Sequence, residues 1–195
     1  FHVGGLAGAH PELPEEAVIR ASRVLMVDHF GIEGMIRAAT IARSAKIPVV
    51  ADFERGDFPR FQELLGLADH LILSRGFALE LTGEWSPGVA ARALWAQDRE
   101  AVVITDGSEG AWFIDRADPR SPRRQPAFRV DAVDTTGCGD VFHGAYASAL
   151  ARGEGMAERI RLASAAAALK VARPGGQAGI PSRSVVDSFL KGRVE

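Results

Sequence analysis

The sequence predicts an α/β fold: a mostly parallel sheet covered by helices on both faces, in three layers. Short apolar segments alternate along the chain with segments whose apolar residues recur at helical spacing. This alternation is typical of a parallel sheet buried between two helical layers. No internal repeat or interdomain linker interrupts it, so residues 1–195 are expected to form a single domain.

Six segments have the composition of strands. Four of them are expected to be parallel and to end in polar residues, where such sheets bind ligands; they are residues 23–28, 47–52, 70–74 and 101–105, which lead to Asp28, Asp52, Ser74 and Thr105. A fifth, residues 110–115, follows a turn at Asp106 and Gly107 and is expected to form a hairpin-like meander with the fourth. Residues 116–126 are polar and predict a loop, and residues 128–133 predict a sixth strand.

Seven segments are predicted to be helices from the spacing of their apolar residues. Pro87 begins one of them, at a position where a missing amide hydrogen costs nothing, and Gly83 ends the one before it. The predicted helices are residues 31–46, 58–67, 77–81, 87–97, 139–151, 156–172 and 184–190.

Composition and charge argue against several kinds of partner. Hydrophobic residues make up 47% of the chain and charged residues 25%, and the net charge of −2 provides no field that attracts nucleic acid or an anionic membrane. No apolar run approaches the roughly 20 residues that span a bilayer, and no signal segment opens the chain. Cys138 is the only cysteine, which excludes an internal disulfide and favours a reducing compartment. The cytoplasm is therefore the expected location.

Residues 134–140, which read Asp-Thr-Thr-Gly-Cys-Gly-Asp, carry the strongest chemical signal. They follow a predicted strand and open a predicted helix, and Gly137 and Gly139 allow the backbone to turn sharply and approach a ligand. The amides of residues 137–140 are expected to be free, because the first turn of a helix contains no internal acceptors. With the positive end of the helix, they form an anion site suited to a phosphoryl group in transfer.

Asp140 lies in the first turn of the predicted helix, where the helix end favours the ionised form of a carboxylate. A carboxylate beside an anion site can accept the proton of a hydroxyl while the oxygen attacks phosphorus. Cys138 is expected to contribute its amide and to pack as a small side chain. A reactive thiol is a secondary hypothesis, because a helix start lowers the pKa of a cysteine.

A glycine-rich turn before a helix is also common in a purely structural role, and a lone G-x-G-D is a weak signal. Two further functions of such a turn do not fit this chain. A dinucleotide-binding G-x-G-x-x-G would need glycine where Phe142 stands. The G-x-G-D of an intramembrane protease would need membrane spans, which the sequence lacks.

The wider pattern around this motif resembles the PfkB (ribokinase-like) family of carbohydrate kinases. Residues 134–140 are similar to the second signature of that family, D-T-x-G-A-G-D, with Cys138 in place of the usual alanine. Residues 102–111 resemble the nucleotide-binding strand and turn, T-x-G-x-x-G. The family's helix and closing loop are matched by residues 165–167, 173–177 and 180–182. The resemblance implies a ribokinase-like fold, of which this chain is the C-terminal portion.

The resemblance also implies roles for individual residues. Asp140 would deprotonate the sugar hydroxyl that takes a phosphoryl group from ATP, and so would touch the substrate as well. The anion hole would consist of Gly137, Cys138 and Gly139. The residues that would hold ATP are Thr105, Gly107, Gly110 and Gly175, the last of them at the adenine pocket.

Further roles concern ions and the sugar. Mg²⁺ would accompany ATP, and many members bind a monovalent cation such as K⁺ at positions matched by Asp134 and the carbonyl of Thr136, although an ordinary polar loop would contain the same residues. Asp28 would touch the sugar or would cap the following helix, and the same alternatives apply to Asp52. His143 has no second ligand at metal spacing and is expected to pack or to contact the sugar.

The first departure from the family concerns Mg²⁺. Many members carry N-x-x-E after the third strand, where this chain has Ser74-Arg75-Gly76-Phe77, so the usual network of water around magnesium is in doubt. Arg75 would contact a phosphate or would be a solvated residue at a helix start. Residues 71–75 resemble ketohexokinase-type and sulfofructose-kinase-type members, which favours a ketose or a related sugar.

The second departure is larger. The first signature of the family, its Gly-Gly sugar-binding turn and its β-sheet lid would all precede the matched residues, and Gly4-Gly5 lacks their context. Because the chain also begins at Phe1 and not at Met, we expect an N-terminally truncated fragment that lacks much of the sugar pocket. Lid strands often form dimers in this family, so a homodimer is expected only for the full-length protein.

Three functions are compatible with these residues. The main hypothesis is ATP-dependent phosphorylation of a sugar hydroxyl. The first alternative is a non-catalytic, regulatory module that binds a nucleotide or a sugar, which the absent N-x-x-E and lid favour. The second is a nucleoside kinase, because nucleoside kinases share the motif.

Overall fold

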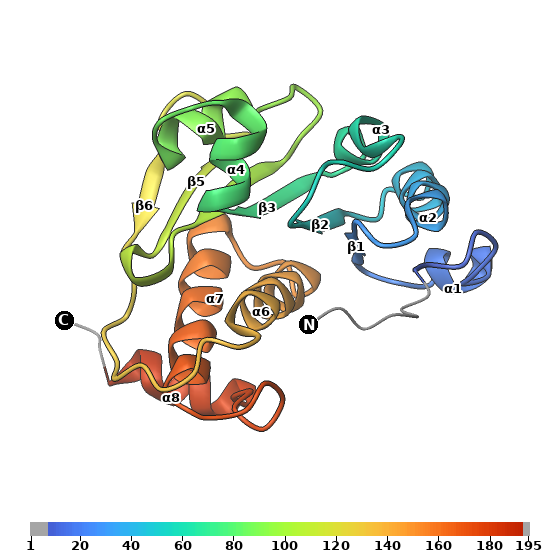
Figure 1. Cartoon of the computed structure of the whole chain (residues 1–195). Helices are drawn as coiled ribbons and strands as arrows, with labels where there is room; N and C mark the ends of the chain where they lie inside the picture. The colour runs from blue at the N-terminus through green and yellow to red at the C-terminus, as the bar shows by residue number, and fades with distance from the viewer. Residues whose placement is uncertain (1–7, 193–195) are drawn as a thin grey trace.

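Within residues 8–192, which the computed structural model describes, six strands form one sheet (Figure 1). They lie side by side in chain order, the first four parallel and the last two antiparallel to their neighbours. Each parallel pair is therefore joined by a crossover that contains helix, as parallel strands require. The strands are β1 (Leu25–Asp28), β2 (Val49–Phe53), β3 (His70–Ser74), β4 (Ala101–Thr105), β5 (Ala111–Asp115) and β6 (Arg123–Gln125).

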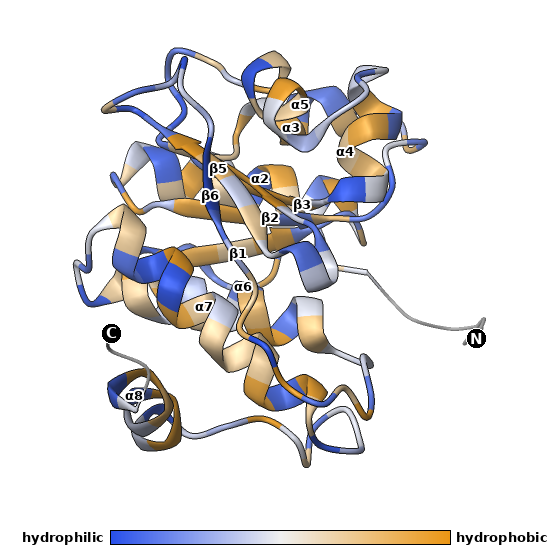
Figure 2. Ribbon diagram, turned by 90° about the vertical axis from the view of Figure 1, so that its left-hand side faces the viewer, coloured by the Kyte–Doolittle hydropathy of each residue, from blue (hydrophilic) through white to orange (hydrophobic). Residues whose placement is uncertain are grey.

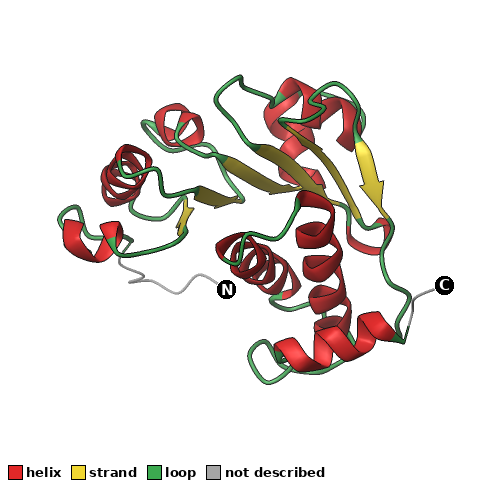
Figure 3. Ribbon diagram, turned by 180° about the vertical axis from the view of Figure 1, so that it is seen from behind, coloured by secondary structure: helices red, strands yellow, loops and turns green. Residues whose placement is uncertain are grey.

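Helices cover the two faces of the sheet, so the molecule has three layers (Figure 3). One face is covered by α2 (Ile32–Ser44), α3 (Phe61–Gly66), α4 (Arg75–Thr82) and α5 (Pro87–Ala93). The other is covered by α6 (Cys138–Ala151) and α7 (Met156–Val171). Two further helices are α1 (Glu16–Arg20), which contacts α2, and α8 (Arg183–Lys191), which packs on the far side of α6 and α7.

The strands differ in how far they are covered. β2, β3 and β4 are buried along nearly their whole length, as parallel strands between two helical layers are, and they appear as an apolar band in Figure 2. β1 is more open: β2 is its only strand partner in the described part of the chain, and Met26 is 42% exposed. One edge of the sheet therefore presents backbone without a neighbouring strand.

The predicted fold class is confirmed, as are the four parallel strands and the antiparallel fifth strand. The prediction of a strand at residues 128–133 is wrong, because these residues follow an irregular path. The backbone amides of Val133 and Asp134 both donate to the carbonyl oxygen of Val171, at 2.8 and 3.0 Å. The end of α7, and not a neighbouring strand, thus accepts the backbone hydrogen bonds of Val133 and Asp134.

The sixth strand is β6, within the predicted loop. Its residues pair with the first half of β5, and two arginines hold it there. The guanidinium of Arg123 lies 4.7 Å from the ring centroid of Phe113, while that of Arg124 donates to the carbonyl oxygen of Glu109 at 2.7 Å. Charged side chains of this kind are common on edge strands, which they protect from further pairing.

Two smaller differences concern helices. The short helix α1, which buries Ile19, was not predicted. The bounds of two predicted helices also differ: the one predicted at residues 58–67 begins at Phe61, and the one predicted at residues 87–97 ends at Ala93. None of the helices within residues 8–192 has both the length and the hydrophobicity needed to cross a membrane. Phe1 and the pair Gly4-Gly5 lie outside the described residues.

Candidate active site

The turn before α6 forms an open helix start. Gly137 is its N-cap, with a φ of 73° in the left-handed region that favours glycine. Within the described residues, the amides of Gly137, Gly139 and Asp140 have no hydrogen-bond acceptor in the protein. The expectation of a free amide is wrong for Cys138, which donates to the carbonyl oxygen of Thr135 at 3.1 Å. Three amides thus remain available to an anion at the positive end of α6.

Asp140 is exposed to solvent in the first turn of α6. A Cβ atom placed on Gly137 would lie 3.6 Å from Oδ2 of Asp140, so the carboxylate lies over the glycine turn and not in the protein interior. A side chain at position 137 would meet that carboxylate at ordinary van der Waals distance, but the positive φ would strain the backbone. The carboxylate and the free amides therefore share one surface.

The thiol of Cys138 does not have the properties of a nucleophile. Burial raises the pKa of this thiol, against the expected effect of the helix start. Its Sγ faces the carbonyl oxygen of Asp134 at 3.8 Å. The secondary hypothesis of a reactive cysteine is wrong in its direction, and packing is the role that the contacts support.

Asp134 holds the turn in shape. Its Oδ1 accepts the amide of Thr136 at 2.9 Å, and its Oδ2 accepts the amide of Gly175 at 2.8 Å. The bond from Thr136 is the main reason why the pKa of Asp134 is lowered to about 2. The carbonyl oxygen of Asp134 accepts the side chain of Lys170 from α7 at 2.9 Å. Asp134 therefore joins the turn to α7 and to the loop that follows it.

The carboxyl ends of the parallel strands face this turn through Asp52. Oδ1 of Asp52 lies 3.3 Å from Nε2 of His143 on α6, and its charge interacts with that of Asp140. Burial is the largest effect on Asp52 and raises its pKa, while His143 acts in the opposite direction. The start of α6 and the end of β2 thus bring two carboxylates to the same site.

His143 is almost fully buried and faces two backbone carbonyl groups. Its Nδ1 lies 2.8 Å from the carbonyl oxygen of Gly139, one turn earlier in α6, and its Nε2 lies 3.1 Å from that of Ile72 in β3. The side chain therefore fixes the start of α6 against the sheet. No group of three His, Cys, Asp or Glu residues that could hold a metal is found among residues 8–192.

Asp28 lies beside Asp52 in the sheet register. Its carboxylate accepts the amide of Phe30 at 2.8 Å, just before α2 begins. This contact supports the interpretation that Asp28 stabilises the turn into the helix. A contact with a sugar remains a prediction.

The turn at residues 105–110 lies at the end of β4, where Thr105 is the register partner of Ser74. A Cβ atom at Gly110 would lie 2.0 Å from the carbonyl oxygen of Gln125. The close approach of β6 is therefore enough to require a glycine at this position, whatever its role toward ATP. Arg75 forms an ion pair with Asp106, Nη1 to Oδ1 3.4 Å, and its side chain is half exposed. The roles of Thr105, Gly107 and Gly110 toward ATP remain predictions.

A cavity of about 580 Å³ opens beside the turn. Thr136, Gly137 and Asp140 line it together with Gly176 of the loop after α7. Its apolar wall comes from both helices and the loop: Val141, Ala145, Leu162, Ala166, Ile180 and Pro181. The predicted residues Thr105, Gly107, Gly110 and Gly175 do not line it, although Gly176 and Gln177, which follow Gly175, do. An apolar wall that ends at free amides is suited to a flat ring that carries phosphates.

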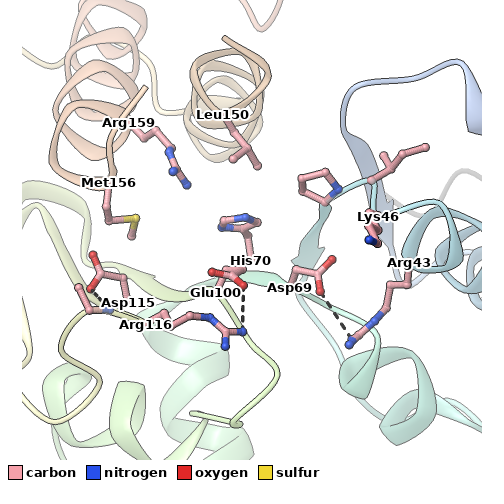
Figure 4. A pocket seen from close by; sticks show the side chains of 13 residues that line it. Arg43, Lys46, Asp69, His70, Glu100, Asp115, Arg116, Leu150, Met156 and Arg159 are labelled. Atoms are coloured by element: carbon pink, nitrogen blue, oxygen red, sulfur yellow. Dashed lines mark hydrogen bonds and ion pairs between the residues drawn. The ribbon is translucent and has the colours of Figure 1, made fainter. Parts of the chain in front are cut away.

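A second pocket, of about 640 Å³, lies at the opposite end of the sheet (Figure 4). It contains none of the residues predicted for the site. Two of its arginines are paired with acids: Arg116 with Glu100 at 2.9 Å, and Arg43 with Asp69 at 3.7 Å. Parallel sheets bind their ligands at the carboxyl ends of the strands, so the smaller cavity is the better candidate for chemistry.

Comparison with known proteins agrees with this geometry. The family model described as pfkB family carbohydrate kinase matches residues 8–183. A protein named ribokinase from Haemophilus influenzae is 31% identical over 182 residues, which cover 91% of this chain and 58% of the relative.

Solved structures give the same result. A putative ribokinase from Agrobacterium tumefaciens superimposes with a TM-score of 0.83 at 30% identity, over 92% of this chain and 58% of that one. The ribokinase of Arabidopsis thaliana, complexed with ribose and ATP, superimposes with a TM-score of 0.80 at 27% identity, over 90% and 58%. The chain thus spans 58% of the length of each of these proteins.

Proposed function

The chain belongs to the pfkB family of carbohydrate kinases, and on this premise we propose that residues 134–140 form the phosphoryl-transfer centre of an ATP-dependent sugar kinase. One observation carries the proposal: the exposed carboxylate of Asp140 lies over the glycine turn, beside amides with no acceptor in the described protein. Transfer of a phosphoryl group needs a proton acceptor for the incoming hydroxyl and donors for the phosphate oxygens. This turn supplies both.

The proposed reaction is an in-line displacement. The oxygen of a sugar hydroxyl attacks the γ-phosphorus of ATP, and Asp140 takes the hydroxyl proton. The bond from phosphorus to the bridging oxygen breaks, and ADP leaves with that electron pair. The free amides of Gly137, Gly139 and Asp140 and the positive end of α6 stabilise the charge on the transferred oxygens.

The cavity beside the turn supports a position for ATP. The apolar wall formed by α6, α7 and residues 176–181 would take the adenine, and the phosphates would extend toward the free amides. Magnesium neutralises phosphate charge in such reactions. Because residues 8–192 contain no set of three ligands for a metal, phosphate oxygens and water would supply most of its coordination, with Asp52 and Asp140 on the same side.

Candidate substrates come from the comparisons and from the sequence. The similar proteins reported above are named ribokinase, which makes ribose the first substrate to test. The resemblance of residues 71–75 to ketohexokinase-type members makes a ketose the second, and nucleosides are the third. A regulatory module that binds ATP or a sugar without turnover is the remaining alternative.

The test replaces Asp140 by asparagine in the protein at its natural full length. We expect ADP release with the best sugar to fall by about 10³-fold, because the proton acceptor is lost. The dissociation constant for ATP, measured by calorimetry, should change less than about threefold, because the amides remain. Asp118→Asn, at an exposed loop position, is the matched control and should retain full turnover.

Each contrary result has a distinct meaning. Normal turnover in Asp140→Asn would remove Asp140 from the proposed role. ATP binding by the wild-type protein, without ADP release for any ribose, ketose or nucleoside, would favour the regulatory alternative.

A further inference from the structure

We propose that the ammonium group of Lys170 takes the place of the monovalent cation expected beside Asp134 and Thr136, so that catalysis at this site needs no added potassium. The inference rests on the proposed function, because it concerns the same turn. Lys170 would then be a positioning residue, since it acts on the reacting groups through Asp134.

The ammonium group of Lys170 is buried, so it needs a partner inside the protein. The side chain is 0% exposed, on the face of α7 that packs against the turn before α6. A buried ammonium is strongly unfavourable unless it has a hydrogen-bond acceptor and a counter-charge. Asp134 provides both: Nζ of Lys170 donates to its carbonyl oxygen at 2.9 Å and lies 3.9 Å from its Oδ2.

The same contacts leave little for a metal cation to bind. A K⁺ ion would need several oxygen ligands, and the carboxylate of Asp134 already accepts the amides of Thr136 and Gly175. The main-chain oxygen of Asp134 accepts Lys170 itself. A second cation on these oxygens would also lie next to the ammonium, and like charges so close repel one another. The oxygens of Asp134 are thus taken by other donors, and this residue does not fit the expected ion.

The ammonium acts on the reaction centre through a short path. Lys170 holds the carbonyl of Asp134, the carboxylate of Asp134 holds the amide of Thr136, and Thr136 is followed directly by the glycine N-cap of α6. A positive charge fixed behind this turn holds the free amides in place and favours negative charge in front of them. Because the charge is covalently attached, it is present at any salt concentration.

The first experiment measures turnover of the full-length protein while potassium chloride replaces tetramethylammonium chloride at constant ionic strength. Tetramethylammonium is too large and too weakly coordinating to substitute for K⁺. We expect turnover to change less than about twofold up to about 100 mM potassium. Saturable activation by about tenfold or more would overturn the proposal.

The second experiment replaces Lys170 by methionine, which keeps an unbranched apolar stem. We expect kcat to fall by about tenfold or more while KM for the sugar changes little. Added potassium or methylammonium should raise the kcat of the variant by at least about threefold. Lys191→Met, at an exposed position of α8, is the control and should behave as wild type. A folded Lys170→Met variant with normal kcat, or with a loss that no cation restores, would contradict the proposal.

The third experiment requires no turnover. Potassium should raise the melting temperature of Lys170→Met by at least about 2 °C relative to tetramethylammonium, and should leave that of wild type unchanged, because a ligand stabilises only a protein with a site for it. Equal shifts in the two proteins would overturn the inference. These shifts in a protein that phosphorylates no sugar would refute the proposed function alone. If Lys170→Met does not fold, the response of wild type to potassium decides.

Discussion

At the scale of single residues, His143 decides whether the start of α6 is held against the sheet. Its ring lies between the carbonyl groups of Gly139 and Ile72 and beside the carboxylate of Asp52. Gly139 is next to Asp140 in the chain, so a movement of the imidazole moves the proposed base. The carbonyl group of Ile72 is buried, which makes the contact with it costly to lose.

We expect His143→Leu to lower both stability and turnover. The buried carbonyl group of Ile72 would lose this partner, at a cost of about 1–3 kcal/mol in the free energy of unfolding, as measured by urea denaturation. The first turn of α6 would also be less well positioned, so kcat should fall more than KM for ATP rises. His10→Leu, at an exposed histidine, should change neither quantity, and an equally harmless His143→Leu would refute the positioning role.

Prediction of site residues from the sequence succeeded where those residues are close together in the chain. Asp140 and Gly137 belong to seven consecutive residues, so their proximity follows from one turn. His143 contacts Ile72, and Lys170 contacts Asp134, across 71 and 36 positions of the chain. Only the fold brings such residues together. For Lys170 one signal was present, because it is a charge within the apolar run of a predicted helix.

At the scale of elements, Arg99 joins three segments on the face opposite to α6. Its guanidinium donates to the carbonyl oxygens of Leu65 at 2.7 Å and Ala68 at 3.1 Å, and also to that of Leu94. Leu65 belongs to the last turn of α3 and Leu94 is the C-cap of α5. A cation at two helix C-termini is favourable for both.

We expect Arg99→Met to destabilise the protein by about 3 kcal/mol or more, because three carbonyl groups, two of them in buried contacts, would lose a charged donor. Arg99→Lys should recover only part of this, since an ammonium cannot span all three acceptors as the planar fork does. The measurement is urea denaturation. Arg92→Met, at an exposed position of α5, serves as the control. A loss no larger than that of the control would show that the helix ends need no such donor.

The prediction of strands failed where the composition of a segment did not match the presence or absence of a neighbouring strand. Residues 128–133 have strand-like composition but no neighbouring strand to pair with, so their amides bond to the end of α7. Arg123–Gln125 has the composition of a loop, yet β5 offers a free edge and Phe113 a ring beneath Arg123. Pairing depends on what lies beside a segment, and a single sequence does not state this.

At the scale of the whole molecule, the layer order and the position of the proposed site followed from the sequence, whereas the pocket of about 640 Å³ did not. The proposed site lies at the carboxyl ends of the strands, and the pocket of Figure 4 lies at their amino ends. The chain spans 58% of the length of the similar proteins, and the proposed site uses only residues within it.

Acid should destabilise the whole molecule through His70 at the amino end of the sheet. Burial lowers the pKa of His70 from 6.5 to about 3, so the native state stays neutral where the unfolded chain takes up a proton. This penalty is absent above pH 6.5 and grows as pH falls from 6.5 toward 3, by about 1.4 kcal/mol per pH unit. It reaches about 2–3 kcal/mol near pH 4.5.

Urea denaturation between pH 7.5 and about pH 4.5 measures this effect. Carboxylates such as Asp134 also titrate toward low pH, so the informative quantity is the difference between wild type and His70→Gln, which cannot take up the proton. The variant should lose less stability on acidification than wild type. Parallel pH profiles for the two proteins would show that the buried imidazole is not responsible.

The bond between the carboxylate of Asp134 and the amide of Gly175 has a consequence for redesign of the proposed active site. The loop that would contact the purine and the turn that would perform the reaction are both held by the carboxylate of Asp134. Mutations introduced after α7 to exchange ATP for another phosphate donor should therefore alter the speed of the reaction together with the preference for the base. Selection for a new donor would need a compensating change near position 134 to recover rate.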